Sequence, residues 1–331
     1  MDEPIAQPNR SRAPLFLALG AIGAILVSLF YIGFVRRSNA IDGTGLLANA
    51  TPTGTPDADY TIPKDNPDRL DVLILGIRGE NDPNAETGGA LLTDSIQILS
   101  YDQTTKKSAI ISIPRDLYIT VTDGKKEKIN AAYEYGAYHS PNGLRFIQDR
   151  MSRVTGVYID KVVIFDFSSF KTIIDALGGI DVVLEKPFTE TQQWGYEFSL
   201  PAGKNHLNGQ SALYYARSRY STSDFDRSRR QQQIMFAIKE KLVALDFFAD
   251  PVKSFSIMNL IRSNIKTDVG VWDLKQFLNL ASETDFVSLK RYVISDENLL
   301  KVDKGPQNSY ILVPKTGNLT EVKKIFQEII D

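Results

Sequence analysis

Short apolar runs alternate with amphipathic segments from about residue 70 to the C-terminus. Apolar runs bounded by polar residues are typical of buried strands, and they predict strands at residues 70–76, 95–101, 108–113, 160–167, 180–184, 286–294 and 310–313. Apolar positions at helical spacing predict helices at residues 128–138, 143–154, up to residue 177, near 254–265 and 271–281, and from Leu319 onward. Ser168 or Ser169 can cap the helix that Gly178 and Gly179 end.

This interleaving of strands and helices sets the expected fold class. The polar turn at residues 102–107 joins two of the strands as a hairpin. The whole pattern predicts a layered α/β/α domain with a central mixed sheet. We assign this domain to residues 68–331, of which 248–331 carry the least diagnostic pattern.

A different pattern precedes the domain. Residues 15–35 carry no charge, and Arg36 and Arg37 follow them directly. A run of this length spans a bilayer. The alternative is a cleavable signal sequence, but the run is too long and the two arginines intervene before the small residues at 38–40. We therefore expect one transmembrane helix in the cytoplasmic membrane, a cytoplasmic tail at residues 1–14, and an extracytoplasmic domain.

Composition adds limits on the chemistry. Residues 36–67 are rich in Thr, Gly, Ala, Asp and Pro, which is typical of a flexible linker. The 331 residues are 43% hydrophobic, enough for a substantial core. Cysteine is absent, which excludes disulfides and thiolate zinc sites. His139 and His206 are too isolated in the sequence to indicate a histidine zinc site.

Positive charge is concentrated in one segment of a chain whose formal net charge is -2. Residues 216–233 contain five arginines, namely Arg217, Arg219, Arg227, Arg229 and Arg230. Concentrated positive charge on a slightly acidic protein indicates a specific anionic ligand rather than a generally basic surface.

The helix that begins in this segment carries polar residues on its apolar face. Arg227 and Gln231 lead into Ile234 and Ile238 at spacings of three and four, a stripe that continues to residues 242 and 245, whereas Arg229 points nearly the opposite way. A buried guanidinium needs an anion or a carboxylate, and phosphate accepts its donors bidentately. The pattern favours a phosphate-binding face. An internal ion pair with Asp224 or Asp226, or a solvated helix start, is the alternative.

Three polar clusters interrupt the apolar elements at their ends. They are TDS at residues 93–95, PRD at 114–116 and KINAAY at 128–133. Ligands of open α/β sheets bind where strands end. Taken singly, Asp94 and Asp116 are ordinary turn residues, and Asn130 can simply begin a helix.

The order TDS, PRD, KINAAY, ARSR and DFDRSRRQQQ, together with FSLPAGKNHLNGQSALYYARSR, resembles the LytR-CpsA-Psr family of membrane-anchored cell-wall enzymes. The likeness runs from about residue 70 to residue 245 and includes the single N-terminal anchor. The resemblance implies a phosphotransferase that moves a glycopolymer from a polyprenyl-pyrophosphate carrier onto peptidoglycan. The reaction forms a phosphodiester and releases polyprenyl phosphate.

The resemblance also implies roles for individual residues. Arg115, Arg217, Arg219 and Arg227 would grip the pyrophosphate, and Asp224 would orient their guanidinium groups. Asp94 would hold magnesium or take a proton from the acceptor hydroxyl. Further substrate contacts are expected from Arg78, Asp116, Asn130, Arg230 and Gln231. Phosphoryl transfer depends mainly on charge neutralisation and alignment, which suits such a residue set.

The sequence departs from the family pattern at two positions. Family members commonly carry an Asp where this chain has Arg78, so a second acidic metal ligand is missing there. Asp82 can substitute as a magnesium ligand, or Arg78 adds to the phosphate grip and lessens the dependence on metal. Asp226 stands where a Gly is frequent.

A polyprenyl tail also needs an apolar slot. Phe165, Phe167, Phe170 and residues 234–238 are candidates to line it, but the default for apolar stripes assigns them to the packed core.

Other functions remain open from the sequence. Arg78 at an acidic position motivates a non-catalytic module that binds pyrophosphate lipids or wall polymer, and a polyprenyl-pyrophosphate pyrophosphatase is a near variant. Nucleic acid is not expected as a partner, because the net charge is negative, no helix-turn-helix stands out, and the anchor places the domain outside the cell.

Overall fold

The computed structural model describes residues 62–244, with gaps at 83–84, 86–88 and 123, and then residues 265–269 and 289–330. The predicted tail, anchor and nearly all of the linker lie outside these ranges. Within them, no helix combines the length and the apolar character needed to cross a bilayer.

A six-stranded mixed sheet forms the centre of the domain, in the order β11-β6-β1-β2-β3-β12. Its strands are β1 (Arg69–Ile77), β2 (Thr93–Asp102), β3 (Ser108–Ser112), β6 (Lys161–Asp166), β11 (Ile265–Thr267) and β12 (Lys290–Val293). β1 runs parallel to β6 and antiparallel to β2, and β3 runs parallel to β12. The predicted mixed sheet is therefore confirmed.

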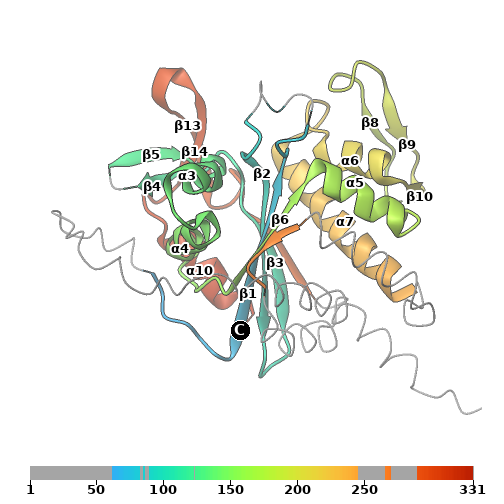
Figure 1. Cartoon of the computed structure of the whole chain (residues 1–331). Helices are drawn as coiled ribbons and strands as arrows, with labels where there is room; N and C mark the ends of the chain where they lie inside the picture. The colour runs from blue at the N-terminus through green and yellow to red at the C-terminus, as the bar shows by residue number, and fades with distance from the viewer. Residues whose placement is uncertain are drawn as a thin grey trace, which may run out of the picture.

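Helices cover both faces of this sheet (Figure 1). One face carries α3 (Ala132–His139), α4 (Gly143–Thr155) and α10 (Thr320–Glu328). The other carries α5 (Phe167–Ala176), α6 (Gly209–Arg217) and α7 (Asp224–Ala244).

Four two-stranded sheets surround the central one. They pair β4 (Tyr118–Thr122) with β5 (Lys125–Lys128), β7 (Ile180–Leu184) with β10 (Gly203–Leu207), β8 (Phe188–Glu190) with β9 (Phe198–Leu200), and β13 (Leu300–Lys304) with β14 (Tyr310–Pro314). Two 3-10 turns, η2 (Ile129–Ala131) and η4 (Pro306–Asn308), complete the described elements.

Side-chain caps fix where three helices begin. Asn142, Asp166 and Asn208 each accept a hydrogen bond from a backbone N–H in the first turn of α4, α5 and α6, respectively. The predicted Ser168 or Ser169 cap of α5 is therefore wrong. The helix already begins at Phe167, so the Asp166 carboxylate reaches both the N–H and the hydroxyl of Ser169, at 2.7 Å each.

Other predicted boundaries also shift. The helix predicted from residue 128 begins only after β5 and η2, because the Lys-rich segment pairs with β4 as a hairpin. The predicted helices at 254–265 and 271–281 lie outside the described residues, apart from Ile265, which begins β11.

The two faces of the sheet meet different surroundings. Leu73, Leu75 and Ile77 of β1 pack into the main hydrophobic core with α3, α4 and α10. Val72 and Ile74, which alternate with them, face the other way, toward a cavity. The strand alternation thus provides a packed core on one side and an apolar cavity wall on the other.

Candidate active site

A large cavity lies between the sheet and the layer formed by α5, α6 and α7. Its volume is about 750 Å³, which is in the range of ligand sites. Most of its wall is apolar, and the side chains that line it include Val72, Ile74, Leu99, Ile110 and Val163 from the sheet and Ile173, Leu213 and Ile238 from the helices.

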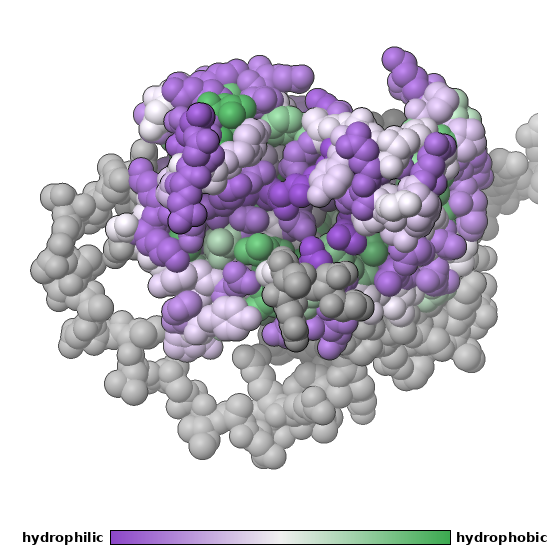
Figure 2. Space-filling view, turned by 90° about the horizontal axis from the view of Figure 1, so that it is seen from above, coloured by the Kyte–Doolittle hydropathy of each residue, from purple (hydrophilic) through white to green (hydrophobic). Residues whose placement is uncertain are grey.

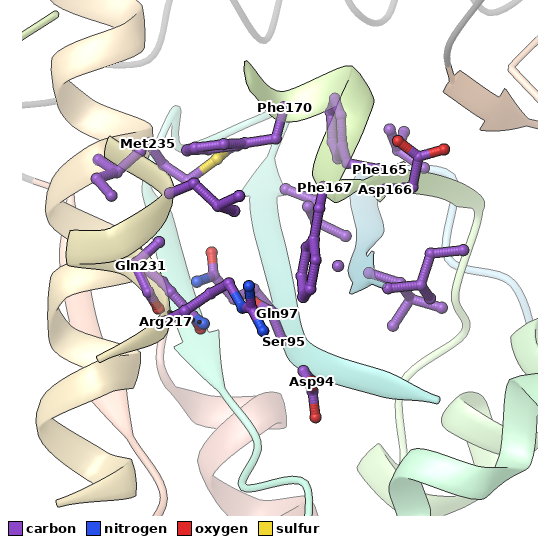
Figure 3. A pocket seen from close by; sticks show the side chains of 18 of the residues that line it. Asp94, Ser95, Gln97, Phe165, Asp166, Phe167, Phe170, Arg217, Gln231 and Met235 are labelled. Carbon is purple, nitrogen blue, oxygen red and sulfur yellow. Dashed lines mark hydrogen bonds between the residues drawn. The ribbon is translucent and has the colours of Figure 1, made fainter. Parts of the chain in front are cut away.

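The apolar candidates of the sequence line this cavity. Phe165, Phe167 and Phe170 all contribute to its wall, and Figure 3 shows these rings around the same space. From residues 234–238, only Ala237 does not line the cavity and instead packs in the adjoining core. The default assignment of these stripes to the core holds in part, because Ile234 belongs to the adjoining core cluster and Phe170 and Ile238 pack against it. Periodicity reports which way a side chain points, not whether the facing layer fills the space.

Five arginines line the same cavity, and we call them the arginine cluster: Arg78, Arg115, Arg217, Arg219 and Arg227. They come from the residue after β1, the segment after β3, the last residue of α6 and the segment that follows it, and the first turn of α7. Figure 2 looks down on this end of the sheet and shows hydrophilic residues around hydrophobic ones near the middle of the face. The cavity thus joins an apolar interior to a strongly cationic region.

Asp94, at the start of β2, is the acidic centre of the cluster. Arg115 donates a hydrogen bond of 2.5 Å to its carboxylate, and Arg227 donates one of 3.0 Å to its backbone carbonyl. Burial alone would raise the pKa of Asp94, but the charges of Arg115, Arg227 and Arg219 outweigh it and hold the pKa below its ordinary value. Asp94 is therefore a stably ionised carboxylate.

Arg227 occupies the face of α7 that the helical stripe predicts. Its side chain is 5% exposed, against 53% for Arg229, which points outward and pairs with Asp226. Arg227 is paired with Asp224 at 2.9 Å, so the internal ion pair given as an alternative does form. Its Nε remains buried without a hydrogen-bond partner among the described residues, as does that of Arg115.

Arg217 has no carboxylate partner among the described residues. Its guanidinium lies 4.0 Å from the ring centre of Phe167 and 5.2 Å from that of Trp194, within cation–π range. Burial and the nearby charge of Arg78 lower its pKa. Figure 3 shows Arg217 and Phe167 pointing into the cavity from different elements. A lowered arginine pKa means that the folded protein holds this charge at a cost that an anion would offset.

Arg78 stands at the edge of the cavity just after β1. It forms an ion pair of 3.7 Å with Asp82. The following turn depends on Gly79, whose φ is +95° and where an added Cβ would lie 2.7 Å from the Cβ of Asp166. The turn at Gly79 therefore holds Arg78 beside the cavity, and few residues other than glycine could adopt the backbone conformation at position 79.

The acidic residues fit a magnesium ion only in part. No group of three or more carboxylate or imidazole side chains gathers as a metal site in the described ranges. Asp94 lines the cavity, whereas Asp82 pairs with Arg78 and does not line it. Magnesium often takes only one or two carboxylates and completes its shell with substrate phosphates and water. The donor set is compatible with a metal held chiefly by a bound pyrophosphate.

Asp116 and Asn130 lie behind the cavity rather than along its wall. Lys128 donates a hydrogen bond of 2.5 Å to Asp116, whose other oxygen is 3.7 Å from Arg115. The Asn130 N–H donates to the carbonyl of Arg115 at 3.3 Å. The structure therefore places both predicted substrate contacts where they support Arg115.

Arg230 and Gln231 separate in the structure. Arg230 is buried and donates hydrogen bonds to the carbonyls of Tyr215 and Ser218, so its predicted place at the substrate is corrected to a structural one. Three residues beyond Arg227, it lies on the flank of α7 that meets α6 rather than the sheet. Gln231 does line the cavity, as predicted, and donates to the carbonyl of Ala216 at 3.2 Å.

Sequence reasoning missed much of the cavity wall, including four residues near the arginine cluster. Gln193, Trp194 and Tyr220 line it beside Arg217 and Arg219, and Asp166 lines it near Arg78. Residues 191–196 read TQQWGY, which has neither helical nor strand periodicity. A tryptophan beside a glycine in a polar segment was the only available signal.

Comparison with known proteins decides the family. The model of the LytR_cpsA_psr family matches residues 39–328. The chain belongs to this family. The resemblance stated from the ordered sequence clusters is confirmed.

Individual members of the LytR-CpsA-Psr family are moderately similar to the chain. The polyisoprenyl-teichoic acid–peptidoglycan teichoic acid transferase TagV of Bacillus subtilis is 30% identical over 267 residues, which cover 78% of this chain and 64% of TagV. The regulatory protein MsrR of Staphylococcus aureus is 28% identical over 275 residues, which cover 81% of this chain and 78% of MsrR.

Solved structures of the family share the fold. The crystal structure of B. subtilis TagV has a TM-score of 0.59 at 29% identity and covers 81% of this chain and 99% of that one. A structure of TagT bound to LI-WTA has a TM-score of 0.58 at 22% identity, covering 82% of this chain and 95% of that one. At that identity, the second likeness supports the fold alone.

Proposed function

We propose that this LytR-CpsA-Psr protein is a phosphotransferase that moves a glycopolymer from a polyprenyl-pyrophosphate carrier to peptidoglycan. The observation that carries the proposal is the cavity itself, which continues from an apolar interior to five arginines. A polyprenyl pyrophosphate has the same two-part chemistry, a long hydrocarbon and a dense anion. The name of the relative TagV describes a transferase with such a donor and acceptor.

The reaction follows from this placement. The acceptor hydroxyl oxygen of peptidoglycan attacks the phosphorus that carries the glycopolymer. The bond from that phosphorus to the bridging oxygen breaks, and polyprenyl phosphate leaves and takes up the proton that the acceptor hydroxyl loses. The protein's part is alignment and charge stabilisation, since phosphoryl transfer needs little covalent chemistry from its catalyst. We assign the grip on the two phosphates to Arg115, Arg217, Arg219 and Arg227, with Arg78 and Gln231 beside them and Asp224 orienting Arg227.

Asp94 is better suited to positioning than to proton abstraction. A general base works best when its pKa lies near the working pH, and the pKa of Asp94 is held below its ordinary value. We propose that Asp94 orients Arg115 and provides one ligand to Mg²⁺. Bound to the pyrophosphate, the ion would neutralise charge that develops on the leaving group.

The proposal includes a membrane setting. A lipid-linked donor resides in the bilayer, and the uncharged run at residues 15–35 is long enough to anchor the chain there. We propose a single-pass protein of the cytoplasmic membrane whose domain lies on the extracytoplasmic side, where peptidoglycan is available. A reporter fused at the C-terminus that is active only outside the cytoplasm would support this topology, and a reporter active inside would contradict it.

The test of function determines which molecule carries the transferred phosphate at the end of the reaction. The full chain in nanodiscs is incubated with polyprenyl-pyrophosphate-linked teichoic acid, Mg²⁺ and peptidoglycan, and the product is digested and analysed for a muropeptide-linked phosphodiester. We expect covalent transfer by the parent and a loss of about 100-fold or more for Arg115→Ala. Arg229→Ala is the matched control, because Arg229 is exposed and does not line the cavity.

The other outcomes identify the alternatives. Release of free phosphorylated polymer into water without attachment to sugar would indicate a pyrophosphatase. Tight lipid binding without any turnover would indicate a binding module and would refute the transferase.

A further inference from the structure

A segment outside the arginine cluster braces two of its members. Residues 190–194, which continue from β8 toward β9, lie against residues 217–221, which we call the arginine loop. The inference drawn from this contact rests on the proposed phosphate grip of Arg217 and Arg219.

The Gln193 side chain hydrogen-bonds to the backbone on both sides of Ser218. Its side-chain Nε2 donates to the carbonyl of Arg217 at 3.1 Å, and the N–H of Arg219 donates to its Oε1 at 2.9 Å. The nitrogen and the oxygen of one side-chain amide therefore bind the backbone of the two residues whose guanidinium groups line the cavity. This two-point contact fixes the relative position of the two arginines along the chain.

Trp194 holds the next element of the same loop. Its indole N–H donates to the hydroxyl of Ser218 at 3.1 Å, its ring packs on Tyr214 at 4.5 Å, and the guanidinium of Arg217 lies 5.2 Å from its ring centre. Because Arg217 has no carboxylate partner among the described residues, aromatic rings are what hold its side chain in place. An arginine side chain left free would lose rotamer entropy on binding a ligand, and holding it in place beforehand removes that cost.

Glu190 anchors the far end of the loop. The residue is fully buried, and its carboxylate accepts hydrogen bonds from the N–H groups of Tyr220 and Ser221 at 3.0 Å each. The hydroxyl of Ser221 also donates to it, at 2.7 Å. A buried carboxylate that accepts hydrogen bonds from the backbone of one loop makes that loop rigid, because moving the loop would leave the buried charge without its hydrogen-bond donors.

We propose that Gln193 and Trp194 are positioning residues of the transfer reaction, and that they preset Arg217 and Arg219 for the pyrophosphate before it binds. They act through the arginines and not on the substrate phosphorus. A small displacement of groups that align a reacting centre reduces rates by about 100-fold, so these two residues contribute to turnover although neither carries charge.

The experiment compares four variants of the full chain in nanodiscs: Gln193→Ala, Trp194→Leu, Trp194→Phe and the control Tyr196→Leu. Tyr196 belongs to the same β8–β9 connection and packs on Tyr214, but it does not line the cavity. Each variant is measured for the temperature of unfolding, for kcat and KM of transfer, and for the affinity of inorganic pyrophosphate by calorimetry.

We expect Gln193→Ala and Trp194→Leu to lower kcat by about 10- to 100-fold and to weaken pyrophosphate binding, with unfolding temperatures near that of the parent. Trp194→Phe keeps a ring beside Arg217 and should recover most of the lost kcat, and Tyr196→Leu should stay within about twofold of the parent.

A purely structural role for the segment would give a different pattern. Gln193→Ala and Trp194→Leu that keep parental kcat and pyrophosphate affinity would overturn the proposal, as would a Tyr196→Leu variant that is equally impaired. The pyrophosphate measurement also separates this inference from the proposed function. A parent that binds pyrophosphate through the braced loop but transfers nothing contradicts the transferase and leaves the bracing intact.

Discussion

Removing the charge of Arg217 should make the ligand-free protein more stable while abolishing transfer. The perturbation is Arg217→Met, which keeps an apolar chain between Phe167 and Trp194. Burial and Arg78 lower the pKa of Arg217, so its charge opposes folding. Replacing buried ion pairs by hydrophobic side chains often stabilises proteins by about 1–4 kcal/mol, and we take this range as the scale for removing the buried charge of Arg217. The two cation–π contacts would be lost, at about 0.5–2 kcal/mol together.

The balance favours the variant modestly. Because Arg217 is only partly buried, we take about 2 kcal/mol from the first range and about 1 kcal/mol for the two lost contacts, which leaves a net gain of about 1 kcal/mol. For a domain of this size, that raises the unfolding temperature by about 2–4 °C. Arg229→Met is the control and should change stability by less than about 0.5 kcal/mol, since its side chain is exposed.

The assay is thermal unfolding with and without a polyprenyl-pyrophosphate ligand. At a ligand concentration about 100 times Kd, binding stabilises the parent by about 2.7 kcal/mol. The parent should then unfold at a higher temperature than Arg217→Met, so the order of the two proteins reverses. If Arg217→Met unfolds several degrees below the parent without ligand, Arg217 is a structural residue and the reasoning is refuted.

Four further results are expected. Asp94→Asn should lose transfer by about 100-fold but bind inorganic pyrophosphate at least as tightly as the parent in calorimetry, because a negative charge leaves the arginine cluster; weaker binding would contradict this. Val163→Trp should fill the cavity beside Ile74. It should weaken binding of long-chain polyprenyl pyrophosphate by 10-fold or more and leave binding of inorganic pyrophosphate unchanged. An equal loss of affinity for the two ligands would place the lipid elsewhere. Chelation of Mg²⁺ with EDTA should lower the transfer rate and added Mg²⁺ should restore it, whereas an unchanged rate would show that the arginines suffice. Burial raises the pKa of Asp160 to about 7, so the folded parent favours the protonated acid and loses stability as pH rises from about 4 to 7. The unfolding temperature of Asp160→Asn should therefore rise relative to that of the parent across this pH range. A difference in unfolding temperature that does not change with pH would exclude this titration.

The sheet was predictable because its strands are continuous apolar runs between polar turns. β1, β2, β3 and β6 each follow this pattern and appear within two residues of the predicted bounds. β14 appears where the strand at residues 310–313 is predicted. Its partner β13 and the β4–β5 and β8–β9 hairpins were missed, since they are short and carry mostly polar or exposed residues. Their pairing depends on tertiary neighbours that no local pattern reports.

The arginine cluster was predictable for a physical reason. Arg227 lies at the head of an apolar helical stripe, where an uncompensated charge would be costly, so an anionic partner could be inferred before any coordinates. Arg230 was misplaced because its burial against α6 satisfies it with carbonyls instead. The cavity was not predictable, because the same residues would line a packed core if the helix layer were closer to the sheet.

The two-sided sheet has a consequence for how the protein works. One of its apolar faces packs against α3, α4 and α10, and the other lines the cavity beneath α5, α6 and α7. A bound isoprenoid would fill this part of the protein interior, entering with each lipid-linked donor and leaving with each polyprenyl phosphate product. We therefore expect the domain to be most ordered midway through the reaction, and exchange of the spent lipid for a loaded one, rather than chemistry at phosphorus, to limit the rate of the cycle.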